Sequence, residues 1–130
     1  ISVVIISDAM RYEVGRELFN QMKDDPRCTA KLSPMMSSLP SYTRLGMAAL
    51  LPHKTLEMRD DYEVYADDVL CNDLAGRQTV LQGHCKDSIC VQFDDIKNLK
   101  KTDLRNIFTG KQVVYVYHNQ IDARGDKANT

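Results

Sequence analysis

The order of apolar and polar residues predicts alternating strands and helices. Residues 1–7 are nearly all apolar and β-branched, which is typical of a strand covered on both faces at the centre of a parallel sheet. Apolar positions then follow helical spacing over residues 10–22, and Pro26 is expected to stop the helix. A further β-like stretch at residues 28–32 would complete the beginning of a βαβ unit.

The rest of the chain continues this alternation. A loop rich in Ser and Pro precedes a short apolar helix at residues 45–51, and residues 56–69 favour a hairpin or edge strands. The later elements are a helix at 74–82, a strand at 89–93, a helix at 102–108 capped by Thr102 and followed by Gly110, and a buried strand at 111–117. The predicted fold class is therefore α/β, a mostly parallel sheet flanked by helices.

Composition sets the limits of this interpretation. The 130 residues are 43% hydrophobic, enough for one core, so we expect a single domain over residues 1–130. The 17 basic and 18 acidic residues are mixed along the chain, and this balance does not indicate nucleic acid as a partner. The apolar runs are far shorter than the ~20 residues of a membrane helix, and no secretory signal is present. Without an export signal, we expect a cytoplasmic protein. We also expect the chain to be a fragment of a longer protein, because it does not open with Met.

The four cysteines are expected to be reduced thiols. Two disulfides are possible by number, but a chain with its own apolar core and no export signal favours free thiols. A structural zinc site is not favoured either, because no Cys-x-x-Cys pair occurs.

Candidate chemistry lies in three polar segments next to predicted strands and helices. Asp8 follows the first strand, the loop before the short apolar helix brings Thr43 to the first turn of that helix, and Asp122 and Asp126 follow the last strand. Each alone has an ordinary explanation, a helix cap for Asp8 or Thr43 and a solvated turn for the other two. Ligands of parallel sheets gather beyond the carboxyl ends of the strands, so these residues could meet at one edge. Together they would supply about half of a site for two divalent cations that activate a hydroxyl group.

Three sequence blocks resemble a known family. Residues 4–13 (VIISDAMRYE), 39–52 (LPSYTRLGMAALLP) and 116–127 (VYHNQIDARGDK) closely resemble, in order, three blocks of the PglZ domain. PglZ domains are similar to the alkaline phosphatase superfamily, whose α/β fold carries a two-metal site at the carboxyl edge of its sheet. The family occurs in bacterial phage-growth-limitation and related defence systems.

The resemblance implies a role for each candidate residue. Asp8 matches the first metal-binding Asp of the superfamily, and Thr43 matches its Ser/Thr nucleophile, which bridges to the metal. Asp122 matches the carboxylate of an Asp-x-x-Gly-His motif that binds the second metal, and Asp126 stands in the His position. An oxygen ligand there favours Mn²⁺ or Mg²⁺ over Zn²⁺. Arg44 and Asn119 are candidates for holding substrate oxygens.

The implied function is metal-dependent phosphoryl transfer on a phosphate ester, or sulfuryl transfer on a sulfate ester, within a phage-defence protein. The later metal ligands of the superfamily should follow residue 130, so we expect an incomplete alkaline phosphatase-like domain. Such a fragment would not hold both cations and would be inactive alone. The alternative is a scaffold that keeps the fold for protein contacts in a defence complex, which Asp126 in the His position would permit.

Other Asp-based folds fit less well. A dehalogenase-like domain needs a second Asp where Met10 stands, and a receiver-like domain needs an acidic pair after its first strand. An adhesion-type metal site would need Asp-x-Ser-x-Ser from Asp8 onward, and this pattern is missing.

Overall fold

The computed structural model describes residues 1–35 and 43–119. The chain divides into two compact units. The first comprises Ile1–Ile6 with Ser38–His118 and contains two sheets; the second comprises Ser7–Ser37 with Asn119–Thr130 and contains helix α1.

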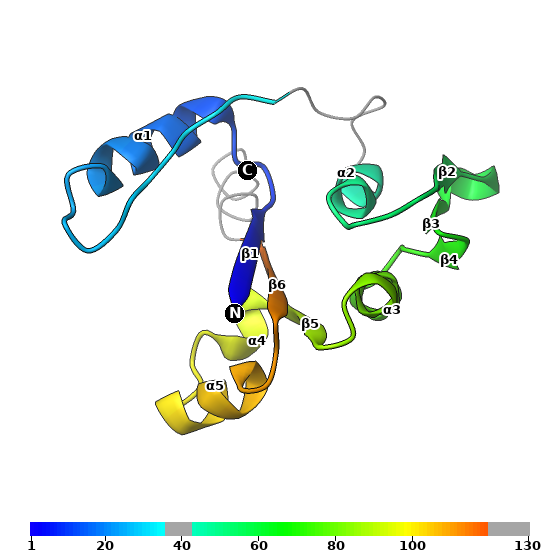
Figure 1. Cartoon of the computed structure of the whole chain (residues 1–130). Helices are drawn as coiled ribbons and strands as arrows, with labels where there is room; N and C mark the ends of the chain where they lie inside the picture. Colours follow the sequence, from blue (N-terminus) through cyan, green and yellow to red (C-terminus); the bar gives the residue numbers. More distant parts are fainter. Residues whose placement is uncertain (36–42, 120–130) are drawn as a thin grey trace. The chain divides into compact units, whose positions relative to one another are not determined.

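The first unit is built around a three-stranded sheet in the order β1-β6-β5, formed by β1 (Ser2–Ser7), β6 (Val113–His118) and β5 (Ser88–Gln92) (Figure 1). β5 and β6 pair in parallel. The Ser2 amide donates to the carbonyl of Gln112, just before β6, at 2.7 Å, so β1 and β6 begin side by side. All three strands therefore run in one direction, as predicted, and their carboxyl ends lie at a single edge.

Helix α3 (Leu74–His84) packs against β5 and covers this sheet. The Gln82 side chain donates to the Ser88 carbonyl at 3.1 Å, and Gln78 accepts from the Cys90 amide at 3.2 Å. Two short helices follow β5, α4 (Phe93–Ile96) and α5 (Lys101–Phe108), and α5 leads into β6. Polar side chains of α3 thus hold the helix in register with the strand.

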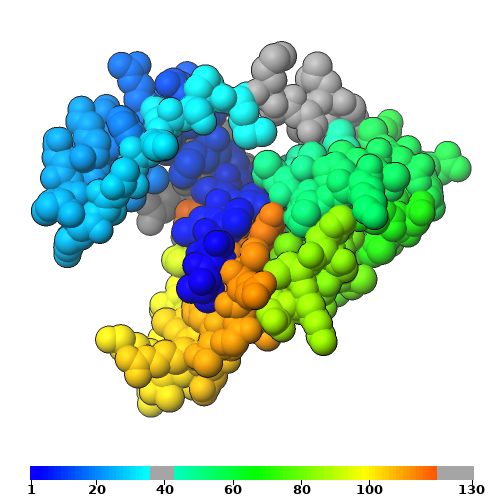
Figure 2. All heavy atoms as spheres, in the orientation of Figure 1, coloured from blue at the N-terminus to red at the C-terminus, as the bar shows by residue number. Residues whose placement is uncertain are grey.

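The position of the first strand differs from the prediction. β6 is the central strand and has four consecutive buried residues, whereas β1 lies at the edge of the sheet. Val3 is 51% exposed and Ile5 is 67% exposed, and Figure 2 shows β1 in dark blue at the surface beside β6 in orange. An apolar run indicates a strand, but hydrogen-bond pairing decides its place in the sheet, and here β6 takes the centre.

A second, antiparallel sheet confirms the predicted hairpin region. β2 (Leu56–Met58), β3 (Val64–Ala66) and β4 (Val69–Leu70) pair in the order β2-β3-β4, with the 3₁₀ turn η1 (Asp60–Tyr62) between β2 and β3. Helix α2 (Thr43–Ala49) packs on β2 and β3. The Tyr115 hydroxyl of β6 donates to the Leu50 carbonyl at 3.2 Å, which ties α2 to the parallel sheet.

In the second unit, helix α1 (Tyr12–Met22) ends before Pro26, as predicted, and has no buried residue. The strand expected at residues 28–32 is not formed. Instead, Asp25 accepts from the Arg27 amide at 2.9 Å and from the Arg27 guanidinium, which makes a turn after the helix. A strand needs a hydrogen-bonded neighbour, and this short stretch has none among the described residues.

The predicted cap of α5 is also wrong. The helix begins at Lys101 with Lys100 as its N-cap, and no side chain makes a capping bond there. Gly110 does follow the helix, with a φ of +81° that glycine adopts without strain. None of the four cysteines forms a disulfide, in agreement with the prediction.

Candidate functional site

Asp8 lies directly after β1 and is half-buried. The chain turns sharply there: Ala9 has a φ of +65°, and the Met10 amide donates to the Ser7 carbonyl at 3.4 Å. A left-handed backbone at a non-glycine residue costs about 1 kcal/mol, so the turn is held by its surroundings. The residue that caps α1 is Arg11, so the Asp8 carboxylate does not serve as that helix cap.

Thr43 and Arg44 are the first two residues of α2, and both are exposed. Leu45 and Ala48 are buried and hold the helix against the second sheet. The sequence correctly placed Thr43 in the first turn of this helix. The threonine hydroxyl and the guanidinium therefore come from neighbouring positions at one helix end.

The strand ends carry the remaining predicted residues. Asn119 directly follows β6 and is exposed. The His118 ring packs edge-on against Phe93, the residue after β5, with 5.0 Å between ring centroids. Asp122 and Asp126 lie outside the described residues.

The structure assigns the predicted residues to both units. Thr43 and Arg44 belong to the first unit, and Asp8 and Asn119 belong to the second. Among residues 1–35 and 43–119, no group of three His, Cys, Asp or Glu side chains is arranged to hold a metal ion. The convergence of these residues at one metal site stays a prediction.

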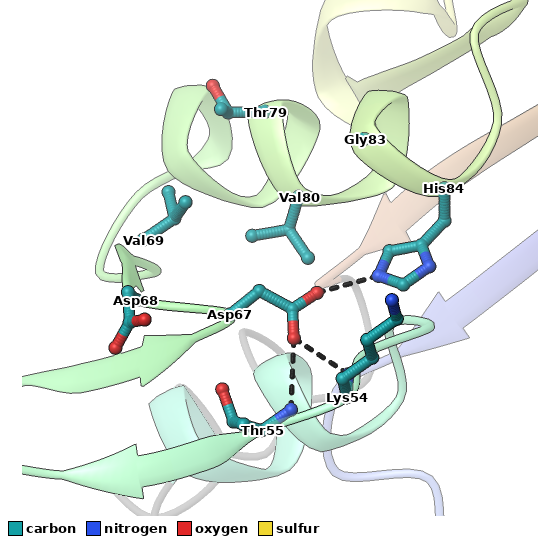
Figure 3. Close-up of a pocket in the computed structure, with 9 residues that line it drawn as sticks. All are labelled: Lys54, Thr55, Asp67, Asp68, Val69, Thr79, Val80, Gly83 and His84. Carbon is teal, nitrogen blue, oxygen red and sulfur yellow. Dashed lines mark hydrogen bonds and ion pairs between the residues drawn. The ribbon is translucent and has the colours of Figure 1, made fainter.

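A pocket of about 500 Å³ lies elsewhere in the first unit, around the hairpin turn between β3 and β4 (Figure 3). Asp67 is at its centre. One carboxylate oxygen accepts from the amides of Lys54 and Thr55 at 2.7 and 2.9 Å, and the other lies 2.6 Å from Nε2 of His84. These bonds join the hairpin turn, the entry to β2 and the end of α3.

The charge of Asp67 is stabilised by its partners. The hydrogen bond from His84, followed by those from the Thr55 and Lys54 amides, lowers the pKa of Asp67 to about 2. Asp67 and Asp68 have φ values of +50° and +64°, as a two-residue hairpin turn requires. The sequence analysis missed this cluster. Two Asp residues between two short apolar stretches are a turn signal that could have located it.

The chain is similar over nearly its whole length to proteins of one known family. The sequence profile of a family described as "BREX system PglZ alkaline phosphatase-like domain" matches residues 2–130. A curated relative from Bacillus cereus (strain H3081.97), "Alkaline phosphatase-like protein PglZ", is 45% identical over 127 residues. A second from Escherichia coli O9:H4 (strain HS), "Alkaline phosphatase-like protein BrxZ", is 43% identical over 129 residues.

Both alignments cover 98% of this chain but 15% of the relative's length. The comparison with solved structures gave no significant match. Within the described ranges, no helix has both the length and the apolar character needed to cross a bilayer.

Proposed function

The chain belongs to the PglZ family of alkaline phosphatase-like domains of BREX systems, and we propose that it is part of a metal-dependent phosphohydrolase that acts in phage defence. The observation that carries the proposal is the family match over residues 2–130, which includes all three polar segments. The places of Asp8 after β1 and Thr43 at the start of α2 support it.

Thr43 is the proposed nucleophile. Its Oγ would form a bond to the phosphorus of the ester, the ester oxygen would leave with the bonding electrons, and the hydroxyl proton would pass to solvent. Water would then release phosphate and restore the hydroxyl group. Arg44, the next residue on α2, would bind the non-bridging oxygens with its planar fork, and Asn119 would donate a further hydrogen bond.

The proposed metal ligands are Asp8, Thr43, Asp122 and Asp126. All four offer hard oxygen atoms, which suits Mg²⁺ or Mn²⁺ better than Zn²⁺, and the Asp8 carboxylate is not used as the α1 cap. Bound cations would neutralise developing negative charge and lower the pKa of the hydroxyl group. Further ligands are proposed to come from other residues of the full-length protein, because this chain spans 15% of the length of its relatives.

A scaffold without catalysis is the second candidate, since Asp126 replaces the His of the superfamily motif. The two functions can be separated in the full-length protein with Thr43→Ala and Asp8→Ala. The control is Thr102→Ala, because Thr102 is also an exposed helical threonine and makes no capping bond.

If the protein is an enzyme, Thr43→Ala should lower hydrolysis of a chromogenic phosphate ester at least about a thousand-fold while keeping bound metal. Asp8→Ala should lose both activity and metal, measured by elemental analysis. Thr102→Ala should match wild type. Full phage protection by the Thr43→Ala and Asp8→Ala variants would instead establish the scaffold.

A further inference from the structure

The Tyr115 hydroxyl group links the helix that carries Thr43 to the central strand of the parallel sheet. Tyr115 lies within β6 and is only 8% exposed, and its hydroxyl donates to the Leu50 carbonyl at 3.2 Å. Leu50 directly follows α2, and its amide donates to the Gly46 carbonyl at 3.2 Å, so the helical turn extends to this residue. The Tyr115 bond therefore joins two segments that are 65 residues apart in the sequence.

Both groups in this hydrogen bond are suited to it. The Leu50 carbonyl lies at the C-terminal end of α2, where the last carbonyl groups of a helix have no intrahelical partner and carry partial negative charge. Burial raises the pKa of Tyr115, so its hydroxyl group stays protonated and remains a donor at neutral pH. A buried donor that lost its acceptor would be left unsatisfied, which costs free energy. The bond is thus a stable part of the fold.

Apolar packing alone would leave α2 more freedom than this bond does. Leu45, Ala48 and Leu51 are buried and belong to the same core cluster as the Tyr115 ring. Such contacts hold the helix on the core, but they are non-directional and permit small tilts. A hydrogen bond has a preferred length and angle. It therefore fixes the end of α2 against β6.

The first turn of α2 is where a tilt has the largest effect. Thr43 is the first residue of the helix and lies roughly 10 Å from Leu50 along the helix axis. A tilt of about 5° at the Leu50 end would move Thr43 by about 1 Å over that length. Misplacement of a reacting group by about 1 Å can lower a rate about a hundredfold.

We propose that Tyr115 is a positioning residue for the proposed nucleophile: through the Leu50 carbonyl it fixes the tilt of α2 and thereby the place of the Thr43 hydroxyl group. The inference rests on the proposed role of Thr43 in catalysis. β6 leads in sequence into Asn119 and Asp122, so the bond connects the helix of the nucleophile with the strand that precedes the proposed substrate and metal ligands.

The test compares Tyr115→Phe with Tyr117→Phe in the full-length protein. Both changes remove one buried hydroxyl group from β6 and keep the ring. Tyr117 is the matched control, because its ring stacks with Arg77 of α3 and its hydroxyl makes no hydrogen bond to α2. Tyr115→Phe should lower kcat for a chromogenic phosphate ester by between about tenfold and a hundredfold, with unchanged bound metal in elemental analysis, whereas Tyr117→Phe should keep kcat within about twofold of wild type.

Two further measurements separate positioning from a general loss of folded protein. In the Thr43→Ala background, Tyr115→Phe should lower the residual rate no further, because no nucleophile is left to position. Hydrogen exchange of residues 43–51 should be faster in Tyr115→Phe than in wild type, while exchange of α3 stays the same. The exchange measurement needs no enzymatic activity.

The outcomes distinguish the role of Tyr115 from that of Thr43. Wild-type kcat in Tyr115→Phe, an equal fall in the Thr43→Ala background, or unchanged exchange of residues 43–51 would overturn the positioning role and leave Thr43 as the proposed nucleophile. Full activity of Thr43→Ala would instead overturn the proposed nucleophile, and the positioning role with it.

Discussion

Gly76 allows α3 to approach the second sheet closely, and replacing it should destabilise the fold. A Cβ atom at this position would overlap the carbonyl oxygen of Leu70, at the end of β4, and would lie 3.1 Å from its carbonyl carbon and 3.2 Å from Oδ1 of Asp73. The obstruction is backbone, which cannot rotate away. Gly83 in the same helix is the matched control, because nothing lies within 4 Å of a Cβ built there.

Two opposing effects set the magnitude. Alanine is favoured over glycine inside a helix by roughly 1 kcal/mol, and this gain applies to both positions. At Gly76 it is opposed by an overpacking cost of about 3 kcal/mol, the upper end of the usual range, because the backbone of β4 must move. We expect Gly76→Ala to lose about 2 kcal/mol of the free energy of unfolding and Gly83→Ala to gain up to about 1 kcal/mol.

Urea unfolding followed by circular dichroism measures both variants directly. A difference of about 3 kcal/mol should also separate their thermal midpoints by roughly 10 °C in a chain of this size. The close approach of α3 and β4 would be refuted if Gly76→Ala were as stable as Gly83→Ala.

Three further outcomes are expected. Asp73→Ala should cost about 1 kcal/mol of unfolding free energy by removing the α3 cap, whereas Asp73→Asn should cost little, and equal urea midpoints would count against the cap. The pKa of Asp67, about 2, lies below its ordinary value of 3.8, so its stabilising contribution is complete above pH 4 and is lost as the pH falls toward 2. Asp67→Asn should therefore lower the urea midpoint at pH 7 and less at pH 3; an equal loss at both would exclude a stabilising role for the ionised Asp67 carboxylate. Iodoacetamide should label exposed Cys28 within minutes and leave Cys90 unlabelled, as read by mass spectrometry; early labelling of Cys90 would contradict its burial and its pKa of about 11.

Local patterns were enough to predict most elements. The helical spacing that predicted α1, the buried run that became β6, and the glycine after α5 each depend on neighbours a few residues away. Pairing between distant segments was not predictable in the same way. Nothing in the apolar run of β1 distinguishes a central strand from an edge strand, since β6 determines that place.

The candidate site likewise has some features that the local sequence predicts and others that depend on residues far apart in the chain. The position of Thr43 at a helix start follows from a loop rich in Ser and Pro before an apolar run. The bond between Asp67 and His84 joins residues on a turn and a helix end, and the burial of Arg77 depends on Tyr117 of a later strand. Such side-chain partnerships arise from tertiary packing, which a single sequence does not encode in its spacing.

The pairing of β1 with β6 also determines when the chain can complete its fold during synthesis. Nearly the whole sequence separates the Ser2 amide from its acceptor at Gln112. A ribosome needs on the order of ten seconds to add that many residues. Throughout this interval β1 cannot pair with β6, and its apolar residues are open to incorrect association. Protection of this strand by a chaperone should therefore matter most before β6 leaves the exit tunnel.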